Sequence, residues 1–136
     1  MSTVVALLGI LAVATGGTLL AEHLRFRHFW ARGCMGRAWR DQFPQASKVE
    51  IRDFLSMFSK AFAFRKSRTL AFRPSDRLID IYRTRYPLRG RPDMLELETL
   101  ARDARKRYGV DLLPLWHEGM TLGEVFERTA SKAAQH

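Results

Sequence analysis

The first 21 residues carry no charged side chain, and this run constrains the chain more than any other feature of its sequence. Valine, leucine, isoleucine and alanine dominate the stretch from Val4 to Ala21. As a helix rising about 1.5 Å per residue, the stretch would be roughly 28 Å long, enough to cross the hydrocarbon core of a bilayer. We therefore expect a transmembrane helix over residues 1–22.

A cleaved signal peptide is the competing interpretation of this run. Signal peptides begin with a positively charged segment, whereas residues 1–3 are Met1-Ser2-Thr3 and contain no lysine or arginine. An uncleaved single span is therefore the favoured prediction.

Small residues recur along the expected membrane helix. Ala12 and Gly16 are four residues apart, as are Gly17 and Ala21, and this spacing lets a second membrane helix approach closely. The alternative is that glycine and alanine are simply common in membrane helices. We predict a packing face for an integral membrane partner at Ala12, Gly16 and Gly17.

A basic, aromatic segment follows the apolar run. Residues 22–40 contain five arginines and one glutamate, a bias that places the flanking domain in the cytoplasm by the positive-inside rule. We predict that residues 23–47 form a juxtamembrane linker, or a broken helix, on the inner membrane, in which Phe26, Phe29, Trp30 and Trp39 suit the headgroup layer. The predicted contacts with anionic lipid headgroups are Arg25, Arg27, Trp30 and Arg32. His23, His28 and Cys34 match no zinc spacing.

The charge of the whole chain points to anionic partners. Its 136 residues carry a formal net charge of +9, which is suited to lipid headgroups, an acidic protein face or nucleic acid. Part of this charge lies beside the apolar run, and the sequence holds no known nucleic-acid-binding motif. We therefore expect no nucleic-acid partner.

A single cysteine, Cys34, excludes an internal disulfide.

Residues 48–130 show the periodicity of an all-helical bundle, followed by a tail over residues 131–136. Ser47 and Glu50 form a capping-box pattern, as do Thr121 and Glu124. Gly109 follows a helical repeat and is expected to end that helix. The predicted core consists of Phe54, Phe58, Leu97, Leu100, Tyr108, Val125 and Phe126.

The order of short motifs in this region resembles that of an acyl carrier protein. Ser75, Leu78 and Asp80 are similar to the family's first loop, Tyr108 to Leu112 to the exit of its second helix, and Thr121 to Val125 to its last helix. The resemblance implies a small helical bundle. It also implies that Met94, within Asp93-Met94-Leu95, stands where the family has the serine that bears phosphopantetheine.

A thioether has no hydroxyl on which to build the phosphodiester, so we expect no cofactor on this chain. Nor does the sequence hold a nucleophile elbow, a Gly-rich phosphate loop or a paired-cysteine motif, so we expect no enzymatic activity. The favoured prediction is a non-catalytic single-pass subunit that docks on a larger membrane complex. The alternative is a membrane-anchored acyl carrier protein that takes part in lipid or acyl transfer.

Arginines surround the segment from which an acyl carrier protein presents its prosthetic group. An arginine pairs with a carboxylate or phosphate through two parallel hydrogen bonds, so these residues suit an acidic partner face. The predicted docking residues are Arg83, Arg85, Arg89, Arg91, Arg102 and Arg105. The alternative is an ordinary surface insertion between helices.

Overall fold

A computed structural model describes residues 2–87 and 95–134, and within these ranges the chain forms helices and no strand. The docking residues Arg89 and Arg91, and Met94, lie outside the described residues. The helices in chain order are α1 (Ser2–Arg25), α2 (Arg27–Trp30), α3 (Gly36–Gln42), α4 (Lys48–Ala61), the 3₁₀ helix η1 (Lys66–Ala71), α5 (Leu78–Arg85), α6 (Leu95–Tyr108), the 3₁₀ helix η2 (Leu113–Leu115) and α7 (Leu122–Ala134).

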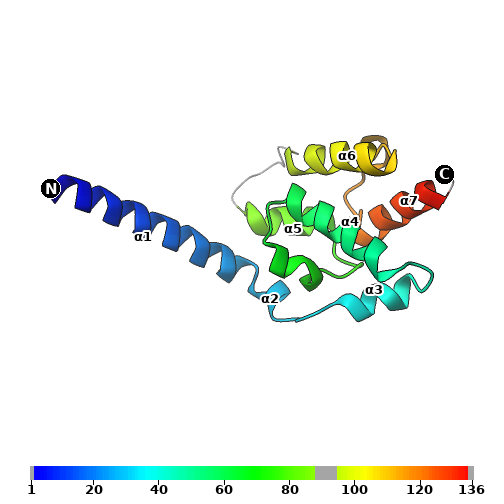
Figure 1. Cartoon of the computed structure of the whole chain (residues 1–136), viewed down its shortest axis with the longest axis horizontal. Helices are drawn as coiled ribbons and strands as arrows, with labels where there is room; N and C mark the ends of the chain where they lie inside the picture. Colours follow the sequence, from blue (N-terminus) through cyan, green and yellow to red (C-terminus); the bar gives the residue numbers. More distant parts are fainter. Residues whose placement is uncertain (1, 88–94, 135–136) are drawn as a thin grey trace.

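Helix α1 stands apart from the rest of the molecule. It extends away from a body formed by the other helices, and the two chain termini lie at opposite ends (Figure 1). The predicted combination of one apolar N-terminal helix with a helical bundle is thus confirmed.

The core of the body is built around α4, which packs against η1 and α6, while α6 also packs against α7. Phe54 and Phe58 on α4 are fully buried, because they repeat at the four-residue spacing that places side chains on one helix face. The sequence-predicted core is confirmed for Phe54, Phe58, Leu97, Leu100, Val125 and Phe126, whereas Tyr108 is only half-buried.

Side chains cap two of these helices at their N-termini. Ser47 and Glu50 make both hydrogen bonds of the capping box at the start of α4. At α7 the box is only half formed: Thr121 Oγ1 accepts the backbone N–H of Glu124, but the Glu124 carboxylate bonds to His117 Nε2 instead. The predicted start of α7 is therefore right. The predicted bond from the Glu124 side chain to the backbone of Thr121 is replaced by the bond to His117.

Helices α5 and α7 start side by side. The backbone N–H of Leu78 donates to Met120 O, and the N–H of Leu122 donates to Asp76 O. The N–H of Gly123 donates to Pro74 O at 2.8 Å. A Cβ on Gly123 would lie 3.0 Å from that carbonyl oxygen, so glycine favours this close crossing.

The segment between α1 and α4 departs from its prediction as a linker. Residues 23–47 include α2 and α3, and Phe26, Phe29 and Trp39 belong to the same core cluster as α4. A domain of about 80 residues buries only a marginal core, and these aromatic rings enlarge it. Residues 65–73 also contribute to the core, since they include η1 and bury Ala71 and Phe72.

Replacing Leu100 with alanine should destabilise the body of the protein by about 2–5 kcal/mol, because its side chain is 1% exposed and the truncation leaves a cavity. The measurement is urea unfolding of the full chain in detergent, with circular dichroism as the signal. Leu113→Ala is the matched control, since Leu113 is 53% exposed. Equal losses in the two variants would contradict the assigned core face of α6.

Candidate membrane interface

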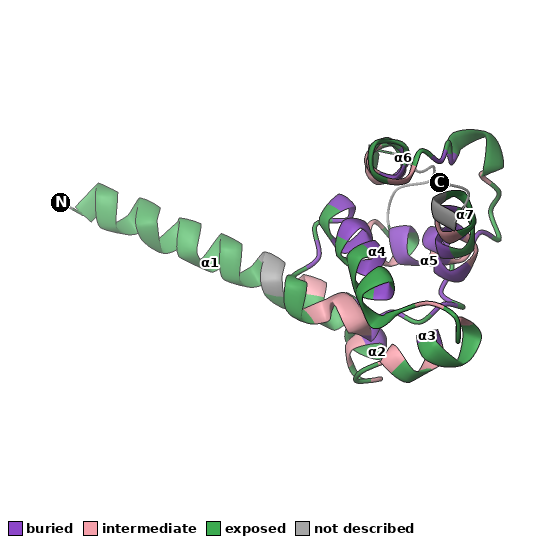
Figure 2. Ribbon diagram, turned by 45° about the vertical axis from the view of Figure 1, so that its right-hand side comes forward, coloured by how far each residue is buried: buried purple, intermediate pink, exposed green. Residues whose placement is uncertain are grey.

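Helix α1 is, among the described residues, the one helix long and apolar enough to cross a membrane. None of its apolar 18-residue window is buried within the protein, and Figure 2 shows it exposed along most of its length. Soluble proteins rarely leave so large an apolar surface in water. Signal sequences near an N-terminus share this length and composition.

The small residues predicted to pack on a partner helix are all exposed on α1. Ala12, Gly16 and Gly17 are exposed, and a Cβ placed on Gly16 or Gly17 would meet no atom within 4 Å. The neighbouring Thr15 hydroxyl donates to the carbonyls of Leu11 and Ala12. That pairing keeps the polar group satisfied within the helix, as an apolar environment requires.

Arg85 at the end of α5 holds the base of α1 against the body. Its Nη2 lies 3.4 Å from Glu22 Oε1, and its Nη1 donates to Phe62 O at 2.6 Å. The guanidinium carbon also sits 4.9 Å from the centre of the Phe64 ring. A further bond joins the same two segments, since Arg25 Nη1 donates to the backbone carbonyl oxygen of Arg85 at 3.2 Å. The structure therefore places Arg85 inside the fold, where we had predicted an exposed docking residue.

The aromatic residues after α1 pack into the body of the protein. Phe26 is fully buried and stacks near Trp30, and it meets the Phe64 ring edge-on with 5.1 Å between the ring centres. Phe29 packs on Phe72. The expectation of a headgroup location is therefore wrong for Phe26, Phe29 and Trp39, because the apolar interior gives these rings a drier environment.

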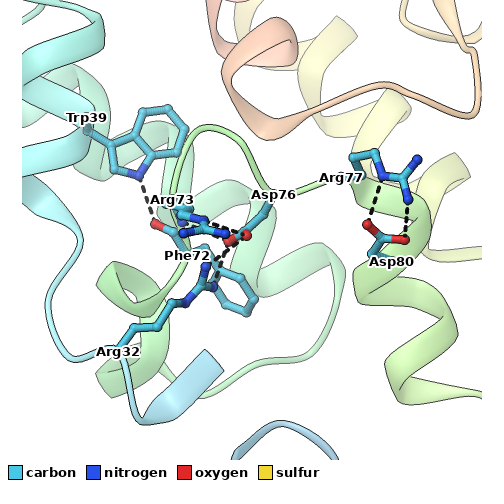
Figure 3. A network of polar contacts seen from close by, with 7 residues as sticks. All are labelled: Arg32, Trp39, Phe72, Arg73, Asp76, Arg77 and Asp80. Carbon is cyan, nitrogen blue, oxygen red and sulfur yellow. Dashed lines mark hydrogen bonds and ion pairs between the residues drawn. The ribbon is translucent and has the colours of Figure 1, made fainter. Parts of the chain in front are cut away.

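A partly buried ion pair connects the same segment to the start of α5 (Figure 3). Arg32 Nη1 and Nη2 lie 2.9 Å and 2.8 Å from the two carboxylate oxygens of Asp76. Asp76 also accepts the backbone N–H of Arg73, and Trp39 Nε1 donates to Phe72 O at 2.9 Å. Arg32, predicted to contact lipid, is thus 17% exposed and paired within the protein.

The other predicted lipid contacts remain at the surface near the base of α1. Arg25 and Arg27 are exposed, and Trp30 is half-buried. Arg68 of η1 lies over the Trp30 ring, with its guanidinium carbon 4.9 Å from the ring centre.

A cavity of about 450 Å³ opens at this place, lined by Leu20, Glu22, His23, Trp30, Ala63, Arg65 and Arg68. Arg65 and Arg68 carry no local sequence signal that would bring them beside Glu22, and only the fold places them there.

The remaining predicted docking arginines lie on two helices. Arg83 on α5 and Arg102 and Arg105 on α6 are exposed. These three residues, unlike Arg85, are placed where a partner can reach them.

Among the residues that the structure describes, Tyr108 and Arg77 have shifted pKa values. Partial burial raises the pKa of the Tyr108 phenol above its usual value. The hydrogen bond from Arg77 to Asp80 raises the pKa of the Arg77 guanidinium above its usual value. Tyr108 lines a second cavity, of about 600 Å³, formed with Phe43, Phe126 and Ala130.

The described residues also bring together no group of three or more His, Cys, Asp or Glu side chains that could hold a metal ion. His117 and Glu124 form a pair at the surface, with Nε2 and Oε2 2.8 Å apart. A search of protein-family models, curated proteins and solved structures found no match to this chain.

Replacing Asp76 with alanine should destabilise the protein by about 3 kcal/mol, because it leaves the mostly buried Arg32 without its counter-charge. Urea unfolding of the full chain in detergent measures the loss. Asp80→Ala is the matched control, since it removes the same type of side chain from the half-exposed pair with Arg77 and should cost clearly less. An equal loss in both variants would show that the Arg32–Asp76 pair is not a main attachment.

Proposed function

We propose that this chain is a non-catalytic single-pass subunit that anchors an acyl-carrier-like helical domain to the membrane, where the domain docks on a larger membrane protein complex. The observation that carries the proposal is the direct attachment of an exposed apolar helix to a folded basic body. Glu22, Arg25 and Arg85 make that attachment without an intervening linker. A domain held in this way stays beside the membrane surface, in reach of integral membrane proteins.

The orientation rests on the charges that follow α1. Arg25, Arg27, Arg37 and Arg40 are exposed, and arginines close to a membrane span favour the cytoplasmic side. The body would therefore lie in the cytoplasm, on the inner membrane.

The docking surface is proposed from the resemblance to acyl carrier proteins and from charge. An acyl carrier protein presents its second helix to its partners, and the helix that matches it here is α6. Arg83 on α5 and Arg102 and Arg105 on α6 are exposed, and their positive charges are suited to acidic residues on a partner. In the membrane, the small residues Ala12, Gly16 and Gly17 would let a helix of the same partner pack on α1.

The non-catalytic role rests on the same resemblance. Met94 stands where an acyl carrier protein has its modified serine, and a thioether cannot form the phosphodiester. A carrier-like body without its prosthetic group retains its protein-binding surface, and binding is the function that we assign to it.

Proteases added to right-side-out membrane vesicles should leave the body of the protein intact, because the proposal places it inside. The readout is a blot against a C-terminal tag, and the control is the same vesicles after permeabilisation, in which cleavage should occur. Cleavage in sealed vesicles would contradict the orientation. An intact mass lacking the first 21 residues would identify α1 as a signal peptide.

Replacing Arg83, Arg102 and Arg105 together with glutamate should release the chain from its partner complex, because all three charges on the proposed surface are reversed. The measurement is co-purification of the tagged full chain from membranes in mild detergent. Arg85 is left unchanged because of its contacts inside the fold.

The control is glutamate at Arg37, Arg40 and Arg52, which are exposed on α3 and α4 and change the net charge equally. Circular dichroism of both variants should match the parent. Retention of the same partners by the α5–α6 variant would remove this surface from the proposal and leave α1 as the docking element.

A further inference from the structure

The cavity beside the base of α1 lies at a defined depth relative to the proposed membrane. The side chains of α1 are uncharged as far as Ala21, and the first charged side chain is Glu22. An apolar helix of about 20 residues fills the hydrocarbon core of a bilayer. Glu22 and His23 therefore fall at the level of the lipid headgroups, and Leu20, on the same cavity wall, falls at the edge of the acyl chains.

Two arginines also line the cavity. Arg65 precedes η1 and Arg68 lies within it, so the two guanidiniums reach the cavity from one short segment. Arg68 rests over the Trp30 ring at 4.9 Å, and this contact restricts the positions that its guanidinium can occupy. The side chain is thus partly ordered before any ligand arrives.

The one carboxylate of the cavity wall is already paired. Glu22 Oε1 lies 3.4 Å from Nη2 of Arg85, and this ion pair offsets part of the repulsion that Glu22 would exert on an anion. Arg65 and Arg68 are then the charges that a ligand meets. Two arginines side by side are suited to the oxygens of a phosphate group.

The size of the cavity agrees with a small ligand group. Its volume of about 450 Å³ falls within the range of about 300–1,000 Å³ found for small-molecule sites. It also adjoins the exposed apolar surface of α1, where acyl chains can lie beside Leu20.

We propose that this cavity binds the headgroup of an anionic phospholipid, with the phosphate between Arg65 and Arg68 and the acyl chains along α1. The inference rests on the proposed membrane anchoring, and it adds a specific lipid site to it. A lipid bound here would contact α1, α2 and η1 together and so would stabilise the angle between the membrane helix and the body.

The test uses the full chain in detergent, titrated with phosphatidylglycerol or with phosphatidylcholine and observed by native mass spectrometry. The parent should retain phosphatidylglycerol in preference to phosphatidylcholine. The double variant Arg65→Gln with Arg68→Gln should bind phosphatidylglycerol at least about tenfold more weakly than the parent, because each arginine near the membrane surface contributes to anion binding.

Two further variants separate binding from folding and from net charge. Arg65→Gln alone alters an exposed side chain and should still weaken binding while thermal unfolding is unchanged. Arg37→Gln with Arg40→Gln removes two exposed charges from α3, away from the cavity, and should bind as the parent does. Equal retention of the two lipids by the parent, or undiminished binding by the double variant, would overturn the site.

Two controls distinguish the other outcomes. Inorganic phosphate should not displace the lipid, and displacement would mean that the site takes a soluble phosphate instead. Alkaline carbonate extraction of membranes should leave the parent and all variants in the membrane fraction. Extraction of the parent would refute the membrane anchor itself, whereas an inserted chain without lipid preference would refute only the lipid site.

Discussion

The ion pair between Arg32 and Asp76 joins parts of the chain that lie 44 residues apart. Transfer of two charges from water into a protein interior is costly, and the geometry must be good to offset that cost. Here both carboxylate oxygens are bonded by one guanidinium, and a backbone N–H adds a further bond. The backbone carbonyl of the same aspartate accepts from Leu122 at the start of α7, so one residue connects the segment after α2 with two helix starts of the body.

This arrangement makes the membrane-proximal segment part of the folded body. Trp39 fills the core between Phe43, Phe54 and Phe126, and its indole N–H bonds to the backbone of residue 72. Helix α1 therefore continues into a packed structure, and Arg85 fixes its base at the end of α5. Such a connection restricts the positions open to the body, so a docking surface or a headgroup site near the membrane loses less conformational freedom on binding.

The elements of the bundle were predictable where their signals are local. Ser47 and Glu50 mark a helix start through bonds between residues three apart, and they make both bonds in the structure. Gly109 marks a helix end because its φ of +71° suits glycine. The half-formed box at Thr121 shows the limit of such signals, since Glu124 bonds to His117, a residue outside the motif. The resemblance to acyl carrier proteins remains a proposal built on the order of these motifs.

The sequence by itself determined the apolar helix α1, the faces of α4, α6 and α7 that enter the core, and the charge of the surface, because each depends on spacing along one segment. Only the tertiary structure decided the roles of residues 23–47 and of the individual arginines. Arg32 and Arg85 form ion pairs within the protein, whereas Arg65 and Arg68 line a cavity beside α1. An arginine has the same local signature in a salt bridge, over an aromatic ring or in solvent, and the residues that distant segments bring next to it choose among these.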